Sequence, residues 1–445
     1  MILGAAGRFR AAVSRVIRHR RGPVLSWALY DWANSAFATV VMAGFFPVFF
    51  KKYWSGGLEV TESTFFLGAA NSAASILVVV MAPFLGAIAD RCSSKKRFLL
   101  FFAAMGVVMT GSLWLVAQGD WAFALILYAM AIVGFSGGNI FYDALLVEVA
   151  QEGDLDVVSA FGFALGYLGG GLLFAFDVVM TLYPGFFGLP DASAAVRLSF
   201  VSVAVWWGIF SVPVFLFVHE RGERTGIGLV PAVRGGLRQL LATLARVRQL
   251  RVTFLFLLAY WLYIDGVDTV VRMAVDYGLS LGFEASGLMV ALLITQFVGF
   301  PAALAYGHLA RRRGARNGIM IAIFAYLFII LWAYQMEREW EFYALAAAVG
   351  LVQGGIQALS RSFYARLIPR DKSGEFFGFY NMLGKFAAVV GPVLMGWVGV
   401  VTGSPRLSIL SLAVLFLAGA VLLILVDEQK GRQMAKALEA TPMSR

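Results

Sequence analysis

The sequence has little cysteine, histidine and charge, and each shortage excludes a class of protein. Among its 445 residues there are one cysteine, Cys92, and three histidines. One cysteine rules out a disulfide framework, and with three scattered histidines it also rules out a Cys/His metal cluster. Only 14% of the residues are charged, against roughly 25% in an ordinary soluble domain, and 60% are hydrophobic. A soluble globule cannot hide this much apolar surface, so the sequence indicates an integral membrane protein.

The apolar residues fall into twelve stretches, each about as long as the roughly 20 residues that a membrane-spanning helix needs. Barrel strands would instead alternate in polarity over about 10 residues, which these stretches do not do. The sequence therefore predicts an all-α membrane protein with twelve transmembrane helices. The predicted spans are Val24–Phe50, Phe65–Ala89, Phe98–Ala117, Trp121–Val147, Val158–Leu182, Val196–Val218, Val252–Leu281, Ala285–Ala310, Gly318–Met336, Trp340–Leu367, Phe376–Thr402 and Leu407–Val426.

The net charge of +10 reflects topology. If both termini are cytoplasmic, 28 of the 36 lysines and arginines lie on the cytoplasmic side, five lie outside, and three lie within helices. Cytoplasmic loops of membrane proteins carry such an excess of basic residues. We therefore expect a multi-pass protein of a bacterial inner membrane with both termini in the cytoplasm, and no nucleic-acid partner.

A polar stretch divides the chain into two halves of six spans. Within it, leucines at helical spacing are flanked by arginines, which predicts an amphipathic helix on the membrane surface; a solvated linker is the alternative. The expected parts are a basic cytoplasmic N-tail (1–23), an N-terminal six-helix bundle (24–218), the cytoplasmic linker with its amphipathic helix (219–251), a C-terminal six-helix bundle (252–427) and a cytoplasmic C-tail (428–445).

The two halves repeat short motifs in the same order, which indicates an internal duplication. Parallel repeats of this kind place a central site at their interface, near the middle of the bilayer. The matched pairs are Trp27-xxx-Asp31-xx-Asn34-Ser35 with Trp261-xxx-Asp265-xx-Asp268-Thr269, Gly137-Gly138 with Gly354-Gly355, Phe161-Gly162-Phe163 with Phe377-Gly378-Phe379, and the loop after the second span with the loop after the eighth.

These features resemble the major facilitator superfamily. The loop after the second span, with Asp90, Arg91, Lys95, Lys96 and Arg97, resembles its signature, although Ser93 and Ser94 stand where a glycine is usual. More specifically, the chain resembles the branch of vacuole effluxers and their bacterial relatives. The segments that carry this likeness are Trp27-Ala-Leu-Tyr-Asp31-Trp-Ala-Asn34-Ser-Ala-Phe, Phe161-Gly-Phe-Ala-Leu-Gly166-Tyr-Leu-Gly-Gly170 and Gly354-Gly-Ile-Gln357-Ala-Leu-Ser-Arg361-Ser.

The resemblance implies transport by alternating access and, for the fungal members, export of neutral amino acids from the vacuole. It also implies that the loop around Asp90, Arg91 and Lys95 pairs with a helix end of the other half when the cytoplasmic side is shut. We count these three residues, with Asp276, as gating candidates.

Charges within the spans each cost about 2.5–3.5 kcal/mol on insertion scales, so each needs a cavity, a partner or a role. In the seventh span, Asp265, Asp268, Arg272 and Asp276 lie on one helical face. We expect a water-accessible stripe on a central cavity, with Arg272 bridging Asp268 or Asp276. A structural ion-pair ladder to a neighbouring helix is the alternative.

The first and fourth spans place Asp31 and Asp143 at similar depth, beside Tyr30 and Asn34. Two nearby carboxylates in a low-dielectric site favour proton binding by one of them, as a proton-coupled carrier requires. Asp143 could instead be a helix-end carboxylate that pairs with a basic loop residue.

In the tenth span, Gln357 and Arg361 lie on one polar face, and by the repeat Arg361 would pair with Asp265. The alternative is that Arg361 extends to the membrane surface. Lys385, in the eleventh span, is a candidate for binding a substrate carboxylate. A structural partner such as Asp177 or Asp268 is equally consistent with its position.

The sequence thus favours a secondary transporter that moves a small polar solute. Its expected partners are this solute, the lipid bilayer and, as a candidate coupling ion, the proton; we expect a monomer without a cofactor. It has no phosphate-binding G-x-x-x-x-G-K-[ST] motif, which argues against ATP-driven transport. Its histidines lie in the predicted tails and loops or, for His308, at the end of the eighth span, which argues against an enzyme. A lipid-handling or non-transporting membrane protein is the alternative function.

Overall fold

The computed structural model describes residues 22–220, 250–280 and 287–440, together with positions 231, 235, 236, 238, 240 and 243. Throughout this part of the chain the regular structure is helical, without strands. The predicted amphipathic helix of the linker falls mostly outside the described residues, as does the N-tail up to residue 21.

Twelve helices among the described residues are long and apolar enough to cross a membrane, which confirms the predicted number and fold class. The first span runs from Gly22 to Trp54 and includes two π-helical segments, Phe37–Phe45 and Phe50–Trp54, on either side of α2. The other helices of this half are α2 (Phe46–Phe49), α3 (Val60–Arg91), α4 (Lys95–Ser112), α5 (Trp121–Ala144), α6 (Leu146–Val149), α7 (Leu155–Leu182) and α8 (Ala192–Phe217).

The second half repeats this pattern of long apolar helices. The twelfth span consists of two helices, α15 and α16, and a further amphipathic helix, α17, follows it. The helices of this half are α10 (Arg251–Ser280), α11 (Gly287–Arg313), α12 (Ala315–Gln335), α13 (Glu339–Arg366), α14 (Ser373–Thr402), α15 (Pro405–Ser411), α16 (Ala413–Leu425) and α17 (Glu428–Ala440).

Polar residues at the ends of the spans satisfy the backbone groups that a helix leaves unpaired. The carboxylate of Asp191 accepts a hydrogen bond from the Ala194 N–H at 2.8 Å and begins α8. The carboxylate of Glu220 accepts the N–H groups of Lys95 and Lys96, at 2.8 and 2.9 Å, and so caps α4 from a distant part of the chain. The apolar runs set the helix lengths, and these caps fix where two of the helices begin.

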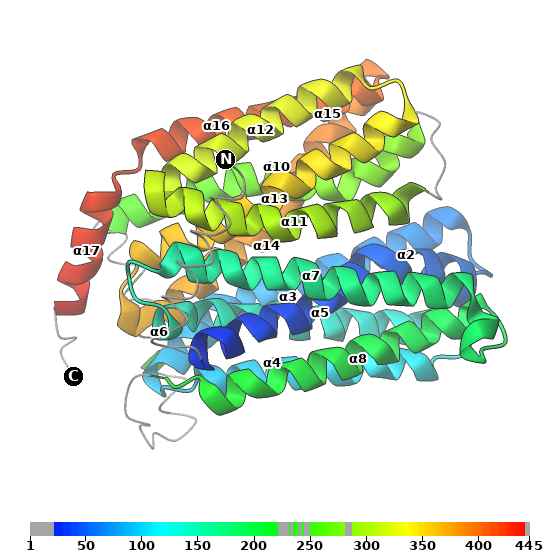
Figure 1. Cartoon of the computed structure of the whole chain (residues 1–445), viewed down its shortest axis with the longest axis horizontal. Helices are drawn as coiled ribbons and strands as arrows, with labels where there is room; N and C mark the ends of the chain where they lie inside the picture. The colour runs from blue at the N-terminus through cyan, green and yellow to red at the C-terminus, as the bar shows by residue number, and fades with distance from the viewer. Residues whose placement is uncertain are drawn as a thin grey trace.

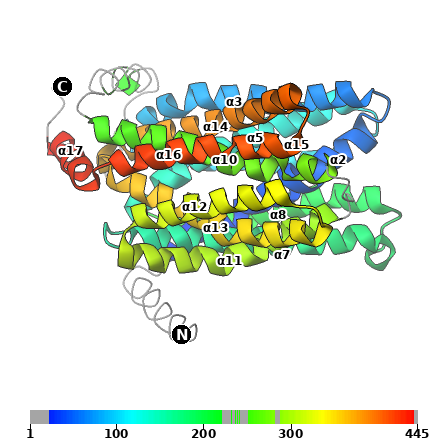
Figure 2. The ribbon, with the colours of Figure 1, turned by 90° about the horizontal axis from the view of Figure 1, so that it is seen from above.

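The helices form two bundles that lie side by side along the length of the molecule (Figures 1 and 2). Helices α3 to α8 lie in one bundle and α10 to α16 in the other, with α7 beside α11 and α3 beside α14 at their interface. Each pair joins spans that are far apart in the sequence, so the space between the bundles is lined by both halves.

Contact between α3 and α14 is closest at the end of the molecule that carries α17, which we call the closed end. A Cβ atom on Gly86 would lie 2.1 Å from the carbonyl oxygen of Gly374, so the two backbones touch there. Near the other end of α3, the small residues Gly68, Ser72 and Ala73 are exposed. The two halves are therefore in backbone contact at the closed end, and these small residues near the other end of α3 are uncovered.

Candidate functional site

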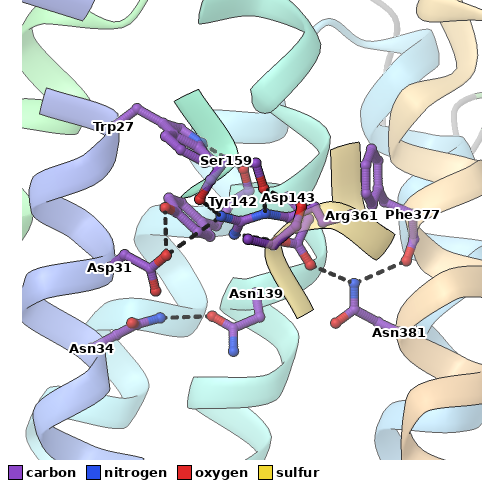
Figure 3. Close-up of polar contacts among 11 residues, drawn as sticks. Trp27, Asp31, Asn34, Asn139, Tyr142, Asp143, Ser159, Arg361, Phe377 and Asn381 are labelled. Atoms are coloured by element: carbon purple, nitrogen blue, oxygen red, sulfur yellow. Dashed lines mark hydrogen bonds and ion pairs between the residues drawn. The ribbon is translucent and has the colours of Figure 1, made fainter. Parts of the chain in front are cut away.

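Arg361 of α13 lies at the centre of a buried polar cluster between the two halves (Figure 3). Only 2% of this residue is exposed, so the alternative that it extends to the membrane surface is wrong. Its guanidinium donates to the Ser159 hydroxyl at 2.9 Å and to the Ser159 carbonyl at 3.0 Å, both on α7. The side chain is thus fixed by residues of the opposite half.

Two carboxylates of the N-terminal half face this guanidinium. Asp143 of α5 lies 3.1 Å from it and Asp31 of the first span 3.6 Å. Asp143 also accepts a hydrogen bond from the Asn381 side chain of α14 at 3.0 Å, and Asp31 accepts one from the Tyr142 hydroxyl at 3.0 Å. The structure therefore brings Asp31 and Asp143 together, and the partner of Asp143 is Arg361 rather than a basic loop residue.

Aromatic rings surround the guanidinium and hold the cluster in place. Its central carbon lies 4.8 Å from the ring centroid of Trp27 and 4.3 Å from that of Phe163, distances at which a cation is attracted to an aromatic face. Trp27 stacks on Tyr142 at 4.5 Å and donates its indole N–H to the Tyr142 carbonyl at 2.9 Å. Gly162 leaves room for these rings, because a Cβ there would lie 2.8 Å from Trp27.

A cavity of about 340 Å³ opens directly beside the cluster. Its lining combines side chains from both halves, and most of the substrate or coupling-ion candidates from the sequence contribute to it. These candidates are Asp31, Asn34, Asp143, Asp268, Gln357, Arg361 and Lys385. Asn34 donates to Asn139 at 2.6 Å within the wall (Figure 3). Tyr30 is buried behind the wall, with its hydroxyl beside Gly138.

The other side of the cavity carries a second set of charges. Asp268 of α10 and Lys385 of α14 both line it, and their charges act on each other. Of the two partners considered for Lys385, Asp268 is the one that lines the same cavity, whereas the carboxylate of Asp177 accepts hydrogen bonds from Ser202 at 3.0 and 3.1 Å.

The predicted stripe on the seventh span is only partly present. Arg272 is exposed and, among the described side chains, forms no ion pair with Asp268, although their charges interact. The side chain of Asp276 lies outside the described residues, so the alternative bridge to it stays a prediction.

The predicted pair between Asp265 and Arg361 is absent from the described contacts. The carboxylate of Asp265, 1% exposed, accepts the Gly391 N–H at 3.0 Å instead. Pro392 follows Gly391 within α14, and a proline inside a helix removes one backbone hydrogen bond and bends the axis. Asp265 therefore faces a neighbour in its own half and satisfies a backbone N–H of α14 next to this proline.

Two further polar contacts join the halves at the closed end. The carboxylate of Asp90, at the end of α3, accepts the N–H groups of Gly374 and Glu375 at 2.9 and 2.8 Å, where the start of α14 favours negative charge. Lys95 lies 3.4 Å from Asp90 and 3.2 Å from Glu148. This contact is the one expected of Asp90, while Arg91 lies beside Gly235 at the same end.

The second contact at the closed end was missed by the sequence analysis. Asp156 of α7 lies 2.5 Å from the Arg366 guanidinium and accepts a hydrogen bond from Ser362 at 2.6 Å. Nearby, Arg432 of α17 lies 3.3 Å from Glu152 of the N-terminal half. An acidic residue at the start of α7 and a basic residue at the end of α13 were visible in the sequence, but nothing in it showed that they face each other.

Comparison with known proteins gives consistent matches over most of the chain. The family model described as "Vacuole effluxer Atg22 like" matches residues 53–155 and 147–436. The uncharacterized MFS-type transporter YxiO of Bacillus subtilis is 40% identical over 94% of this chain and 98% of its own length. Autophagy-related protein 22-1 of Aspergillus fumigatus is 26% identical over 67% of this chain, which spans about half (52%) of that relative.

Solved structures show the same fold at low sequence identity. The proton:xylose symporter XylE, of the major facilitator superfamily, is 13% identical, with a TM-score of 0.72 over 95% of this chain and 99% of its own. The human organic anion transporter MFSD10 is 16% identical, with a TM-score of 0.66 over 91% of this chain and 99% of its own. The fold expected from the resemblance is therefore confirmed.

Proposed function

Because this chain belongs to the Atg22-like vacuole effluxer family and is a multi-pass membrane transporter of the major facilitator fold, we propose that it carries neutral amino acids by proton-coupled alternating access. In this proposal both termini face the cytoplasm of a bacterial cell, and the closed end is the cytoplasmic end. The observation that carries the proposal is the polar cavity between the halves, with a buried charge cluster directly beside it.

The chemistry of the cavity suits a small zwitterion. Lys385 offers a cation for a carboxylate, and Asp268 offers an anion for an ammonium group. The amide side chains of Gln296, Gln353 and Gln357 add hydrogen-bond donors and acceptors along the same wall. A volume of about 340 Å³ lies at the lower end of the range for small-molecule sites, which is roughly 300–1,000 Å³.

Alternating access requires that the contacts at the closed end can be broken. They are hydrogen bonds and ion pairs between halves, as at Asp90, Asp143 and Asp156, and the apolar packing beside them involves small residues such as Gly86 and Gly374. Rocking the halves would separate these groups and bring the small residues at the other end of α3 into contact with the opposite half.

The charge count at Arg361 supports coupling to protons. Two carboxylates, Asp31 and Asp143, share one guanidinium, so one negative charge is left for a proton to neutralise. Both hydrogen-bond donors to Asp143, Arg361 and Asn381, come from the C-terminal half, whereas Asp31 also accepts a hydrogen bond from Tyr142 of its own half. Protonation of Asp143 would therefore weaken the contact between the halves directly.

The proposal is tested with purified protein in liposomes. We expect uptake of radiolabelled neutral amino acids to depend on an imposed pH gradient, and Lys385→Met to raise the KM at least about tenfold by removing the carboxylate partner. Lys430→Met, at an exposed lysine of α17, is the matched control. If no amino acid is transported, or if Lys385→Met and Lys430→Met behave alike, the proposed role of the cavity is wrong.

A further inference from the structure

A second cavity, of about 280 Å³, adjoins the polar one and extends into the C-terminal half. We call it the side cavity. Its walls come mainly from α10, α11, α12 and α13, and the residues that line it are predominantly apolar. They include Val270, Leu292, Ile329, Ile330, Leu345 and Val349.

Two of the few polar groups in the walls of the side cavity, the hydroxyls of Tyr277 and Thr295, are hydrogen bonded to backbone carbonyls. The Tyr277 hydroxyl donates to the Ala333 carbonyl at 2.6 Å, and the Thr295 hydroxyl lies within hydrogen-bond distance of the Ala291 and Ala346 carbonyls, at 3.0 and 3.1 Å. Most of the space that remains is lined by hydrocarbon. Burial of an apolar group in this space is favourable, whereas a charged group would lose its hydration there without gaining a partner.

The size of the side cavity sets which group it can hold. An apolar cavity of about 150 Å³ stays dry and binds benzene. The side cavity is larger, and residues such as Ile330 and Met336, at 0% and 1% exposure, show that its walls include buried core residues. It therefore has room for a branched aliphatic or an aromatic side chain.

The two cavities meet at a shared wall formed by Ala38, Thr39, Gln296 and Gln353. The side-chain oxygen of Gln353 is buried and has no hydrogen-bond partner among the described residues. A molecule whose polar head lies between Lys385 and Asp268 could thus place its apolar part in the side cavity and its N–H groups toward Gln353.

We propose that the side cavity is the subsite for the substrate's side chain and selects amino acids with bulky apolar side chains over small ones. This inference rests on the proposed function, because it takes the polar cavity as the site of the zwitterionic head. In a hydrophobic pocket one methylene group changes discrimination by about 10- to 200-fold. Leucine and phenylalanine should therefore have kcat/KM values at least about tenfold above that of glycine.

Filling the side cavity tests the inference. Ala346 lines it and Ala347, its neighbour on α13, does not, so Ala346→Leu and Ala347→Leu make a matched pair. We expect Ala346→Leu to lower the ratio of leucine to glycine kcat/KM at least about tenfold, and Ala347→Leu to leave this ratio unchanged. Ala333→Leu fills the cavity from α12 and replaces the first variant if thermal unfolding shows that Ala346→Leu is not folded.

The outcomes separate this inference from the proposed function. If the parent protein transports no amino acid, the proposed function fails. If it transports glycine as well as leucine, or if neither filling variant changes the ratio, the inference about the side cavity fails and the proposed function stands. If a phospholipid, and not leucine, raises the unfolding temperature of the parent but not of the filled variant, the cavity holds lipid and the inference is overturned.

Discussion

Replacing Asp143 with asparagine should open the closed end. The asparagine side chain has nearly the shape of the aspartate but carries no charge, so Asp143→Asn imitates the protonated acid. Arg361 would keep only the Asp31 carboxylate, at 3.6 Å, as an ionic partner among the described residues. Removing one partner of a buried ion pair costs about 3–5 kcal/mol, and because Asp31 remains nearby we expect the lower value, about 3 kcal/mol.

This free energy is lost from the closed state in particular, because Arg361 and Asn381 reach Asp143 from the opposite half. Each 1.4 kcal/mol changes an equilibrium constant tenfold, so about 3 kcal/mol shifts the ratio of closed to open molecules roughly 100-fold. Asp31→Asn is the matched comparison. It loses only a 3.6 Å ionic contact and can keep the Tyr142 hydrogen bond, so we expect about 1 kcal/mol and a shift of roughly fivefold.

The assay is the alkylation rate of a cysteine buried at the closed end. Ala160 is 1% exposed, and its methyl would lie 2.6 Å from a Cβ on Gly307 of the other half. Ala160→Cys, with Cys92 replaced by serine, should react slowly in the parent, much faster with Asp143→Asn and only slightly faster with Asp31→Asn. Equal rates for the two asparagine variants, both folded by thermal unfolding, would refute the reasoning.

Two further predictions concern packing. Gly86→Ala forces a Cβ against the Gly374 carbonyl and should destabilise the closed state by about 1–3 kcal/mol, measured by the same alkylation assay. Gly68→Ala lies on the same helix, and no atom lies within 4 Å of its new Cβ, so it should have no effect. Asp265→Ala leaves the Gly391 N–H without its acceptor and should lower the free energy of unfolding by about 1–3 kcal/mol. Asp265→Asn keeps an acceptor oxygen and should lower it by less. A larger loss in the asparagine variant would contradict the role given to the Asp265–Gly391 hydrogen bond.

The sequence predicted the spans well because a single physical requirement defines them. A predicted fourth span of Trp121–Val147 compares with an observed Trp121–Val149, and a predicted fifth span of Val158–Leu182 with Leu155–Leu182. Hydrocarbon length and the exclusion of charge leave little freedom in such elements. The closed-end contact of Asp90 was also anticipated, but from the family resemblance and not from the residues alone.

The sequence could not predict which charges face each other. Spacing along a helix shows that Asp265 and Asp268 share a face, but small differences in rotation decide that Asp265 contacts Gly391 while Asp268 reaches the cavity. The repeat suggested a partner for Arg361 within its own half, whereas that side chain crosses the interface to Asp143. Such pairings depend on how the halves are docked, which no local pattern specifies.

Some residues of the site were missed for a simpler reason. Asn139, Asn381 and Ser159 are uncharged, and isolated amides or hydroxyls are common in membrane helices, where they often bond within the protein. Here Asn381 and Ser159 hold Asp143 and Arg361 across the interface. In the sequence, Asn139 and Asn381 stand out only because each amide lies within an otherwise apolar span. A search limited to charged residues does not find them.

The contacts at the closed end are asymmetric, because one half supplies the carboxylates and the other supplies the donors. In the interface contacts described above, the carboxylates of Asp31, Asp90, Asp143 and Asp156 come from the N-terminal half, and the donors that cross to them come from the C-terminal half. Two N-terminal halves placed face to face would bring anion against anion, and two C-terminal halves would leave Arg361 and Arg366 without these counter-charges. In these contacts the halves of a duplicated chain are thus complementary to each other and not to themselves, so the charges that hold one molecule together disfavour the pairing of a bundle with its like in a neighbouring molecule.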